Sequence, residues 1–432
     1  MPNLIIMPEN ITFADRDEFN RKPFACNLIK LLEGNNDLSP LAINGAWGTG
    51  KTEFCLKTVH FINSEYNDKL VAGYFDAFSE DHFNDPLTSL LATLYKSFIS
   101  NKNKSEYLAL MAKIILAGGQ KILNHSFPII GELTQAIKEA RDSIIKENFA
   151  NRANIESNFE ELRLLIEKIA HEKTFILFID ELDRCRPDFA LHLLEVIKHV
   201  FNTEHLKIVF VINFDQLVEI VKHNYGSNEA ISQKYLDKFF QLQLKLPSIT
   251  TNTNNKKTLN SITYFDIEFK RLRFFNLPIF KDRHIHQPEN SIPSILFKEL
   301  IEFRNLTLRD IEKLTKYILA YSSFINCNED FYLGTKLLIA FAIFQFTFNE
   351  EIYNNYKTHH NAFINSCETL ISTPPDNNIN RSLRYVLYEL LFGDNQEVVA
   401  LYMGGWHGFM SLEERRTFLT DSFSSLENLI MN

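Results

Sequence analysis

The stretch Leu41-Ala-Ile-Asn-Gly-Ala-Trp-Gly-Thr-Gly-Lys-Thr52 decides the fold. A short apolar run comes first, the pattern GxxxxGK[ST] follows, and residues 53–62 have the composition of a helix. A strand, a glycine-rich turn and a helix in this order form a phosphate-binding loop (P-loop), whose backbone N–H groups surround phosphate oxygens. The N-terminus of the helix adds the positive end of its dipole. The strand before the turn and the helix after it argue against a chance glycine-rich turn.

Nine consecutive residues of this loop are predicted to contact a nucleotide. They are Gly45, Ala46, Trp47, Gly48, Thr49, Gly50, Lys51, Thr52 and Glu53. The glycines let the backbone turn around the phosphates, the Lys51 ammonium adds a mobile positive charge, and the Thr52 hydroxyl can ligate Mg²⁺. The chain has no Asn-Lys-x-Asp motif for reading guanine. We therefore expect the ligands to be ATP and Mg²⁺.

A second motif lies at Thr174-Phe-Ile-Leu-Phe-Ile-Asp-Glu181. Five apolar residues predict a buried strand, and two acids follow it, which is the Walker B arrangement. We expect Asp180 to hold Mg²⁺, through water or in one coordination shell with Thr52, and Glu181 to polarise an attacking water. Surface acids at a strand end are the alternative, but the presence of both halves of one site favours the site.

Two further strand ends are predicted to lie near the phosphates. The apolar strand at 71–78 ends near Asp76, and the strand at 207–213 ends in Asn213, which suits a sensor of the γ-phosphate. Ligands of parallel α/β sheets bind outside the carboxyl ends of the strands, which favours both positions. For Asp76, a solvated loop acid is an equal alternative.

The arginine that would complete a phosphoryl-transfer site has several candidates. No arginine occurs between Arg186 and Arg271, so the candidates are Arg184 and Arg186 beside Walker B, and Arg309 at the start of a later helix. We take Arg309 as the first choice for a sensor acting within the chain. The alternatives are ion pairs, with Asp183 for Arg184 and with neighbouring acids for Arg309.

Composition and charge favour a cytoplasmic globular protein. The chain has 45 lysines and arginines against 54 acids, a net charge of −9, and the basic residues are scattered. Nucleic-acid binding needs a concentrated basic face, so the composition does not predict it, although a local patch formed by the fold stays open. The five cysteines are far apart and form no CxxC pair, which predicts reduced thiols. No signal peptide is evident and no stretch reaches 18 uncharged apolar residues, so we expect no membrane span.

The order of elements predicts an α/β fold, a P-loop NTPase parallel sheet flanked by helices, with an all-α C-terminal domain. Strands alternate with helices up to residue 247, and a helical insertion is expected at about 100–170. A polar break at 248–261 separates two predicted domains, residues 1–250 and 262–432.

The order of these signals resembles the KAP family of P-loop NTPases, in the additional-strand, catalytic-glutamate division that includes the AAA+ and STAND ATPases. The matching segments are residues 17–32, 45–52, 74–78, 179–185, 235–241 and 305–313. The tryptophan inside the P-loop and the Leu-Asp-Arg-Cys sequence after Walker B are the specific signs, because GxxxxGKT alone fits many families.

Two departures from the family bear on function. Many relatives carry transmembrane helices between the P-loop (Walker A) and Walker B, whereas this chain has soluble helices there, so a membrane role is not expected. The family commonly has two aspartates after the Walker B strand, whereas this chain has Asp180 and Glu181. A glutamate reaches further toward a water, which favours hydrolysis.

These observations predict an ATPase that acts as a nucleotide-dependent switch and regulates its assembly into a homo-oligomer or the activity of a protein partner. The resemblance implies bacterial defence against phage or plasmids as one setting. Two alternatives stay open: an ATP-dependent motor or clamp on nucleic acid, and a module that binds ATP without hydrolysing it.

Overall fold

The computed structural model describes two compact units, residues Met1–Pro247 and Ser248–Asn432. The described residues are 12–34, 38–83, 85–99, 103–117, 133–138, 152–170, 173–201, 203–251, 257–281, 288–323, 331–348, 383–392 and 411–427. Each unit has its own hydrophobic core.

The first unit is built on a five-stranded sheet in which every strand pair is parallel. Its strands are β1 (Leu41–Asn44), β2 (Leu70–Asp76), β3 (Thr174–Asp180), β4 (Leu206–Ile212) and β5 (Leu242–Lys245). They lie in the order β2-β3-β4-β1-β5. The predicted α/β class with a parallel sheet is confirmed. Because β4 lies between β3 and β1, it separates the Walker B strand from the strand that leads into the P-loop.

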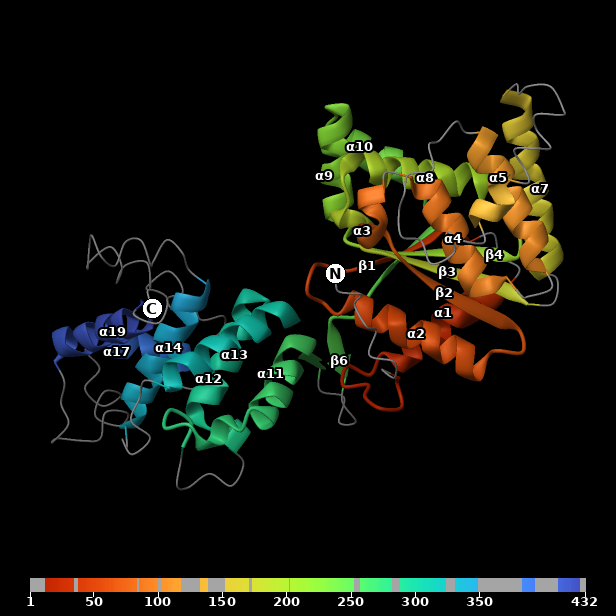
Figure 1. Cartoon of the computed structure of the whole chain (residues 1–432). Helices are drawn as coiled ribbons and strands as arrows, with labels where there is room; N and C mark the ends of the chain where they lie inside the picture. Colours follow the sequence, from red (N-terminus) through yellow and green to blue (C-terminus); the bar gives the residue numbers. More distant parts are fainter. Residues whose placement is uncertain are drawn as a thin grey trace. The chain divides into compact units, whose positions relative to one another are not determined.

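Helices cover both faces of this sheet (Figure 1). One face carries α1 (Lys22–Glu33) and α2 (Lys51–Glu65), and the other carries α4 (Pro86–Phe98), α8 (Pro187–Val200) and α9 (Phe214–Tyr225). Strand side chains alternate between the two cores. In β3, for example, Ile176 and Phe178 belong to the core of α1 and α2, whereas Leu177 and Ile179 belong to the other. A strand buried on both faces explains the continuous apolar run in its sequence.

Helices follow α4 in the region predicted as a helical insertion. α5 (Lys104–Ala117) packs against α4 and against α7 (Arg152–Ala170), and they extend the core that lies under α4 and α8. The buried Tyr107 hydroxyl donates to the carbonyl of Leu91 at 2.9 Å, which ties α5 to α4.

Short elements connect the sheet to its helices. They are α3 (Ala77–Glu80) and η1 (Asp81–Phe83) after β2, η3 (Leu182–Arg184) after β3, and α10 (Glu229–Leu236) before β5. Of these, α10 was not expected from the sequence. Its signal is the N-cap Asn228, whose side chain accepts from the Ile231 amide at 3.0 Å.

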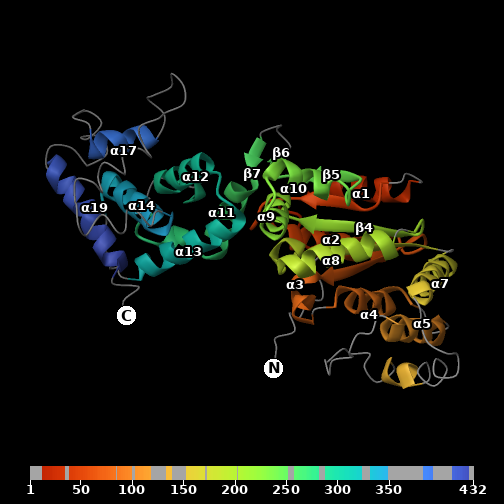
Figure 2. The ribbon, with the colours of Figure 1, turned by 90° about the horizontal axis from the view of Figure 1, so that it is seen from above.

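Within its described residues, the second unit consists of helices, their connections and one short hairpin. The helices are α11 (Asn260–Arg271), η4 (Phe274–Asn276), η5 (Pro288–Asn290), α12 (Ile292–Arg304), α13 (Leu308–Ser322), α14 (Leu333–Phe348), α17 (Leu383–Leu391) and α19 (Leu412–Glu427), several of which are labelled in Figure 2. Fully buried phenylalanines, among them Phe265, Phe269 and Phe297, fill its core. Residues 350–371, whose sequence predicts a further helix, lie outside the described residues. In the described part of the chain, no helix is both long and apolar enough to cross a bilayer.

The hairpin lies inside the predicted polar break. β6 (Ile249–Thr251) pairs with β7 (Lys257–Leu259) in antiparallel register. Its β-branched residues favour a strand, but half-exposed polar side chains gave no apolar run to recognise.

Candidate nucleotide-binding site

The predicted site residues of the first unit meet at the carboxyl ends of four neighbouring strands. In the strand register, Asp76 lies opposite Asp180. Asp180 lies opposite Val211 in β4, and Ile212 lies opposite Asn44, the last residue before the P-loop. Loops that leave the same edge of a parallel sheet share one crevice, where ligands of such sheets bind. Segments far apart in sequence therefore meet in one candidate site.

Two glycines give the P-loop its shape. Gly48 has a φ of 72° and Gly50 a φ of 78°, a left-handed conformation that costs little only for glycine. Gly50 is the N-cap of α2, so the loop runs directly into the helix that begins at Lys51. The Thr49 hydroxyl donates to the carbonyl of Ala46 at 2.8 Å and closes the loop on itself. The helix N-terminus and the loop amides together suit an anion.

The side chain of Lys51 folds back over the P-loop. Its ammonium donates to the carbonyl oxygens of Gly45 at 2.9 Å and Ala46 at 3.3 Å, and the residue is 8% exposed. Burial lowers the pKa of Lys51, whereas the charges of Asp183 and Asp180 raise it. A buried cation held by backbone carbonyls can transfer its hydrogen bonds to phosphate oxygens.

Asp180 is fully buried, and each of its two carboxylate oxygens accepts a hydrogen bond. The amide of Glu181 donates to its Oδ1 at 2.8 Å, and the Tyr74 hydroxyl donates to its Oδ2 at 3.3 Å. Burial raises the pKa of Asp180 to about 6, and the hydrogen bond from Thr52 is the largest influence that lowers it. A buried carboxylate beside a hydroxyl offers the hard oxygen ligands that Mg²⁺ prefers. The donor set at Asp180 and Thr52 therefore fits this metal.

Glu181 connects the two motifs. Its backbone has a φ of 61°, a left-handed conformation uncommon outside glycine. Its Oε1 accepts from the Thr52 hydroxyl at 3.4 Å, across 129 residues of sequence, and its Oε2 pairs with Arg184 Nη1 at 2.6 Å. Burial raises the pKa of Glu181, and Arg184 lowers it. The partner of Arg184 is thus Glu181, whereas the sequence suggested Asp183.

Asp183 accepts instead from the P-loop tryptophan. The indole Nε1 of Trp47 donates to Asp183 Oδ2 at 2.5 Å, and 40% of Trp47 is exposed. This bond joins the P-loop directly to the turn after β3. The other arginine of this turn, Arg186, pairs with the buried Asp81 through Nε at 3.0 Å. Both residues lie in the two motifs, but the sequence does not predict that they meet.

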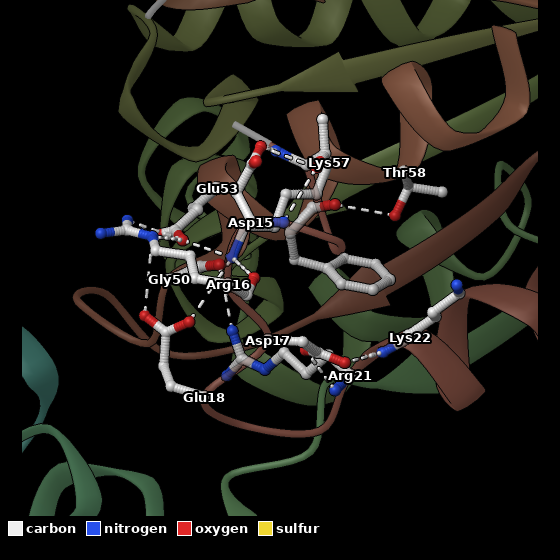
Figure 3. Close-up of polar contacts among 12 residues, drawn as sticks. Asp15, Arg16, Asp17, Glu18, Arg21, Lys22, Gly50, Glu53, Lys57 and Thr58 are labelled. Atoms are coloured by element: carbon white, nitrogen blue, oxygen red, sulfur yellow. Dashed lines mark hydrogen bonds and ion pairs between the residues drawn. The ribbon is translucent and has the colours of Figure 1, made fainter. Parts of the chain in front are cut away.

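Glu53 belongs to a charged cluster that joins α2 to residues 16–18, drawn in Figure 3. Its carboxylate accepts from Arg16 Nη2 at 2.8 Å and from Lys57 Nζ at 2.7 Å. Two cations therefore hold the Glu53 carboxylate, and the contact with nucleotide that the sequence suggested stays a prediction.

Asn213 and Arg309 lie in different units. Asn213 follows β4 as the N-cap of α9 and is 8% exposed. The Asn44 side chain, at the end of β1, accepts from the Phe214 amide at 3.0 Å, which joins the two strand ends beside the P-loop. Arg309 is an exposed residue in the first turn of α13, in the second unit. The roles predicted for Asn213 and Arg309 stay predictions.

Across the described residues, no group of three or more His, Cys, Asp or Glu side chains could hold a metal ion by itself. A site for Mg²⁺ that uses one carboxylate, one hydroxyl and the oxygens of bound phosphates needs no such group.

A family model described as the KAP family P-loop domain matches residues 21–321. The chain belongs to the KAP family of P-loop NTPases. The matched range begins at Arg21, at the start of α1, and contains the P-loop, the Walker B strand and Asn213. A P-loop NTPase domain binds a nucleotide, and the residues described above are the candidates for its site.

Comparison with solved structures finds distant similarities. The structure of C. elegans PCH-2 matches at 13% identity with a TM-score of 0.30, over 72% of this chain and 63% of that one. The chain thus spans less than two thirds of the PCH-2 chain. The structure of Drosophila ORC bound to DNA matches at 12% identity with a TM-score of 0.37, over 95% of this chain and 86% of that one. A search of curated proteins finds no match.

Proposed function

We propose that this KAP-family protein binds ATP with Mg²⁺, hydrolyses it, and uses the nucleotide state to control its own assembly or a protein partner. The observation that carries the proposal is the contact between the two motifs. Thr52 at the start of α2 and Glu181 after β3 lie within 3.4 Å of each other, beside the buried Asp180. The two residues proposed to hold Mg²⁺, Thr52 and Asp180, thus lie beside the carboxylate proposed to orient water.

Each residue has a role in the proposed reaction. The Gly48–Thr52 amides and Lys51 bind the phosphates, Thr52 and Asp180 hold Mg²⁺, and Glu181 orients the attacking water. When bound, Mg²⁺ neutralises charge on the β- and γ-phosphates. The raised pKa of Glu181 suits a group that accepts a hydrogen bond from water, because a more basic carboxylate is the better acceptor.

Arg184 restrains Glu181 in this arrangement. Its guanidinium binds one carboxylate oxygen of Glu181 while the other oxygen faces Thr52. Holding one oxygen fixes the side-chain torsions and leaves the second oxygen to orient water. Preorganisation of this kind is the main protein contribution to phosphoryl transfer.

Hydrolysis and assembly are tested together. We would measure phosphate release from ATP and Mg²⁺ by wild type, Lys51→Ala and Glu181→Gln, with size-exclusion light scattering on the same samples. Both variants should lose turnover, and Glu181→Gln should keep ATP and trap a larger assembly. The matched controls are Lys69→Ala and Glu65→Gln, exposed residues on either side of the turn that leads into β2. Their turnover should equal that of wild type.

Three outcomes would change the proposal. ATP binding without turnover in wild type would favour a binding module. Turnover with a salt-dependent affinity for DNA, and without nucleotide-driven assembly, would favour a motor or clamp on nucleic acid. Turnover that survives in Glu181→Gln would refute the role of Glu181.

The proposed setting is defence against phage or plasmids, and its support is the family resemblance. Its test is a plaque assay in cells that express wild type, Lys51→Ala or Lys69→Ala at equal levels. Protection by wild type and Lys69→Ala, but not by Lys51→Ala, is the expected result. Equal plaque counts in all three strains would refute this setting while leaving the ATPase proposal intact.

A further inference from the structure

Arg21 is a buried cation outside both sequence motifs. It is the N-cap residue of α1 and is 4% exposed. Its Nη2 donates to the carbonyls of Thr49 at 2.8 Å and Pro247 at 3.1 Å, and its Nη1 donates to the carbonyl of Gly50 at 3.2 Å. Figure 3 shows Arg21 and Gly50 among the neighbouring charged residues. One guanidinium thus binds two peptide groups of the P-loop and the last residue of the first unit.

The direction of these carbonyls determines where the adjoining amides point. In a trans peptide the C=O and N–H bonds point in opposite directions. The carbonyls of Thr49 and Gly50 face Arg21, so the N–H groups of Gly50 and Lys51 point away from it. These amides are among the donors that a P-loop offers to phosphate. A cation at the carbonyl end of a peptide also polarises it, which makes the N–H at the other end a stronger donor.

The surroundings of Arg21 fix its position. The Asp17 carboxylate accepts from the Arg21 amide at 2.8 Å and from the Lys22 amide at 2.9 Å, which anchors the start of α1. The Phe19 ring lies 5.0 Å from the guanidinium carbon. Burial lowers the pKa of Arg21 to about 10, so it remains charged at neutral pH. A planar fork of donors can reach three carbonyls from one position, which the single ammonium of lysine cannot reproduce.

We propose that Arg21 is a positioning residue that orients the P-loop amides for phosphate and transmits nucleotide binding to the chain segment that leaves the first unit at Pro247. A bound phosphate would accept hydrogen bonds from the N–H groups of the same two peptides whose carbonyl oxygens accept from Arg21. Any adjustment of these peptides shifts the guanidinium and, through it, the carbonyl of Pro247. This inference rests on the proposed nucleotide site and adds a route by which its state reaches residues 247–251.

The test compares wild type with Arg21→Gln and Arg21→Lys in the full chain. The first readout is the affinity for ATP and for a fluorescent ADP analogue. The second is backbone hydrogen exchange in the peptide covering 246–251, with and without saturating nucleotide. Both variants should bind nucleotide about tenfold more weakly, as expected for the loss of one charge-assisted hydrogen bond. In wild type, nucleotide should slow exchange in this peptide, and in both variants this response should be lost even at saturation.

Lys22→Gln is the matched control, because Lys22 is the next residue along α1 and its ammonium lies over the Phe61 ring rather than on the P-loop. It should bind nucleotide and respond in exchange as wild type does. Circular dichroism and urea midpoints identify folded variants, and Arg21→Lys serves if Arg21→Gln does not fold. Wild-type affinity in a folded variant, or a retained exchange response, would overturn the inference. A wild type that binds no nucleotide would instead refute the proposed function on which it rests.

Discussion

Replacing Asp180 with asparagine should stabilise the nucleotide-free protein while removing a metal ligand. Asp180 is fully buried, and its pKa of about 6 lies well above the 3.8 of an unperturbed carboxyl. Keeping this side chain ionised in the fold therefore costs free energy at neutral pH. Asparagine has nearly the same shape and carries no charge. Its oxygen can accept from the Glu181 amide in place of Oδ1, and its NH2 takes the place of Oδ2, where the Tyr74 hydroxyl can rotate to accept from it.

The expected magnitude follows from the difference between the two pKa values. At about 1.36 kcal/mol for each pKa unit, the difference between about 6 and 3.8 corresponds to about 3 kcal/mol. The folded-state pKa is the higher one, so the folded protein holds its proton to higher pH than the unfolded chain. The contribution to stability is present below pH 3.8 and is lost as pH rises through 6. Asp180→Asn should thus gain up to about 3 kcal/mol over wild type at pH 8, and about half as much at pH 5.

The assay is urea unfolding at pH 5 and pH 8 without nucleotide or Mg²⁺. Pulse hydrogen exchange in the peptides of β3 would report the unfolding of the unit that contains Asp180. The matched control is Asp76→Asn, at the end of the neighbouring strand, where the side chain is partly exposed. Water screens a partly exposed charge, so this variant should change stability by less than about 1 kcal/mol at either pH.

A loss of stability at pH 8 in Asp180→Asn, or a gain that does not depend on pH, would refute this reasoning. Either result would mean that the hydrogen bonds from Thr52, Tyr74 and the Glu181 amide outweigh the cost of burying the charge.

Three further predictions concern the same site. Gly50→Ala, at a φ of 78°, should cost about 1 to 2 kcal/mol of stability and weaken ADP binding, measured by urea unfolding and calorimetry; unchanged values would contradict the role of this backbone conformation. Trp47→Phe removes the donor to Asp183 and should cost about 1 kcal/mol in urea unfolding, whereas the same stability as wild type would show that this hydrogen bond is dispensable. Chelation of Mg²⁺ should weaken ATP binding, measured by titration calorimetry, at least tenfold in wild type and much less in Asp180→Asn. An equal loss of affinity in both proteins would exclude Asp180 as a metal ligand.

Local patterns in the sequence were sufficient to predict the parallel sheet and the two motifs that meet at its edge. The spacing of the P-loop and the apolar run before Asp180 depend on neighbouring residues only, because a strand and the turn after it are shaped by a few consecutive dihedrals and side chains. The same local patterns do not reveal α10 or the hairpin of β6 and β7. Both are short and polar, so their hydrophobic periodicity is weak.

The tertiary structure alone decided which side chains bind one another. Arg21 reaches Pro247 across 226 residues, and Trp47 reaches Asp183 across 136. Arg184 pairs with Glu181 because the left-handed backbone at Glu181 and the turn of η3 bring residues three apart together. Such contacts depend on strand order and on single backbone torsions, which a one-dimensional pattern does not encode. The sequence by itself thus determined the class of the fold and the residues of its motifs. The position of β4 between β3 and β1, and the loops at the edge of the sheet, determined which side chains those motif residues contact.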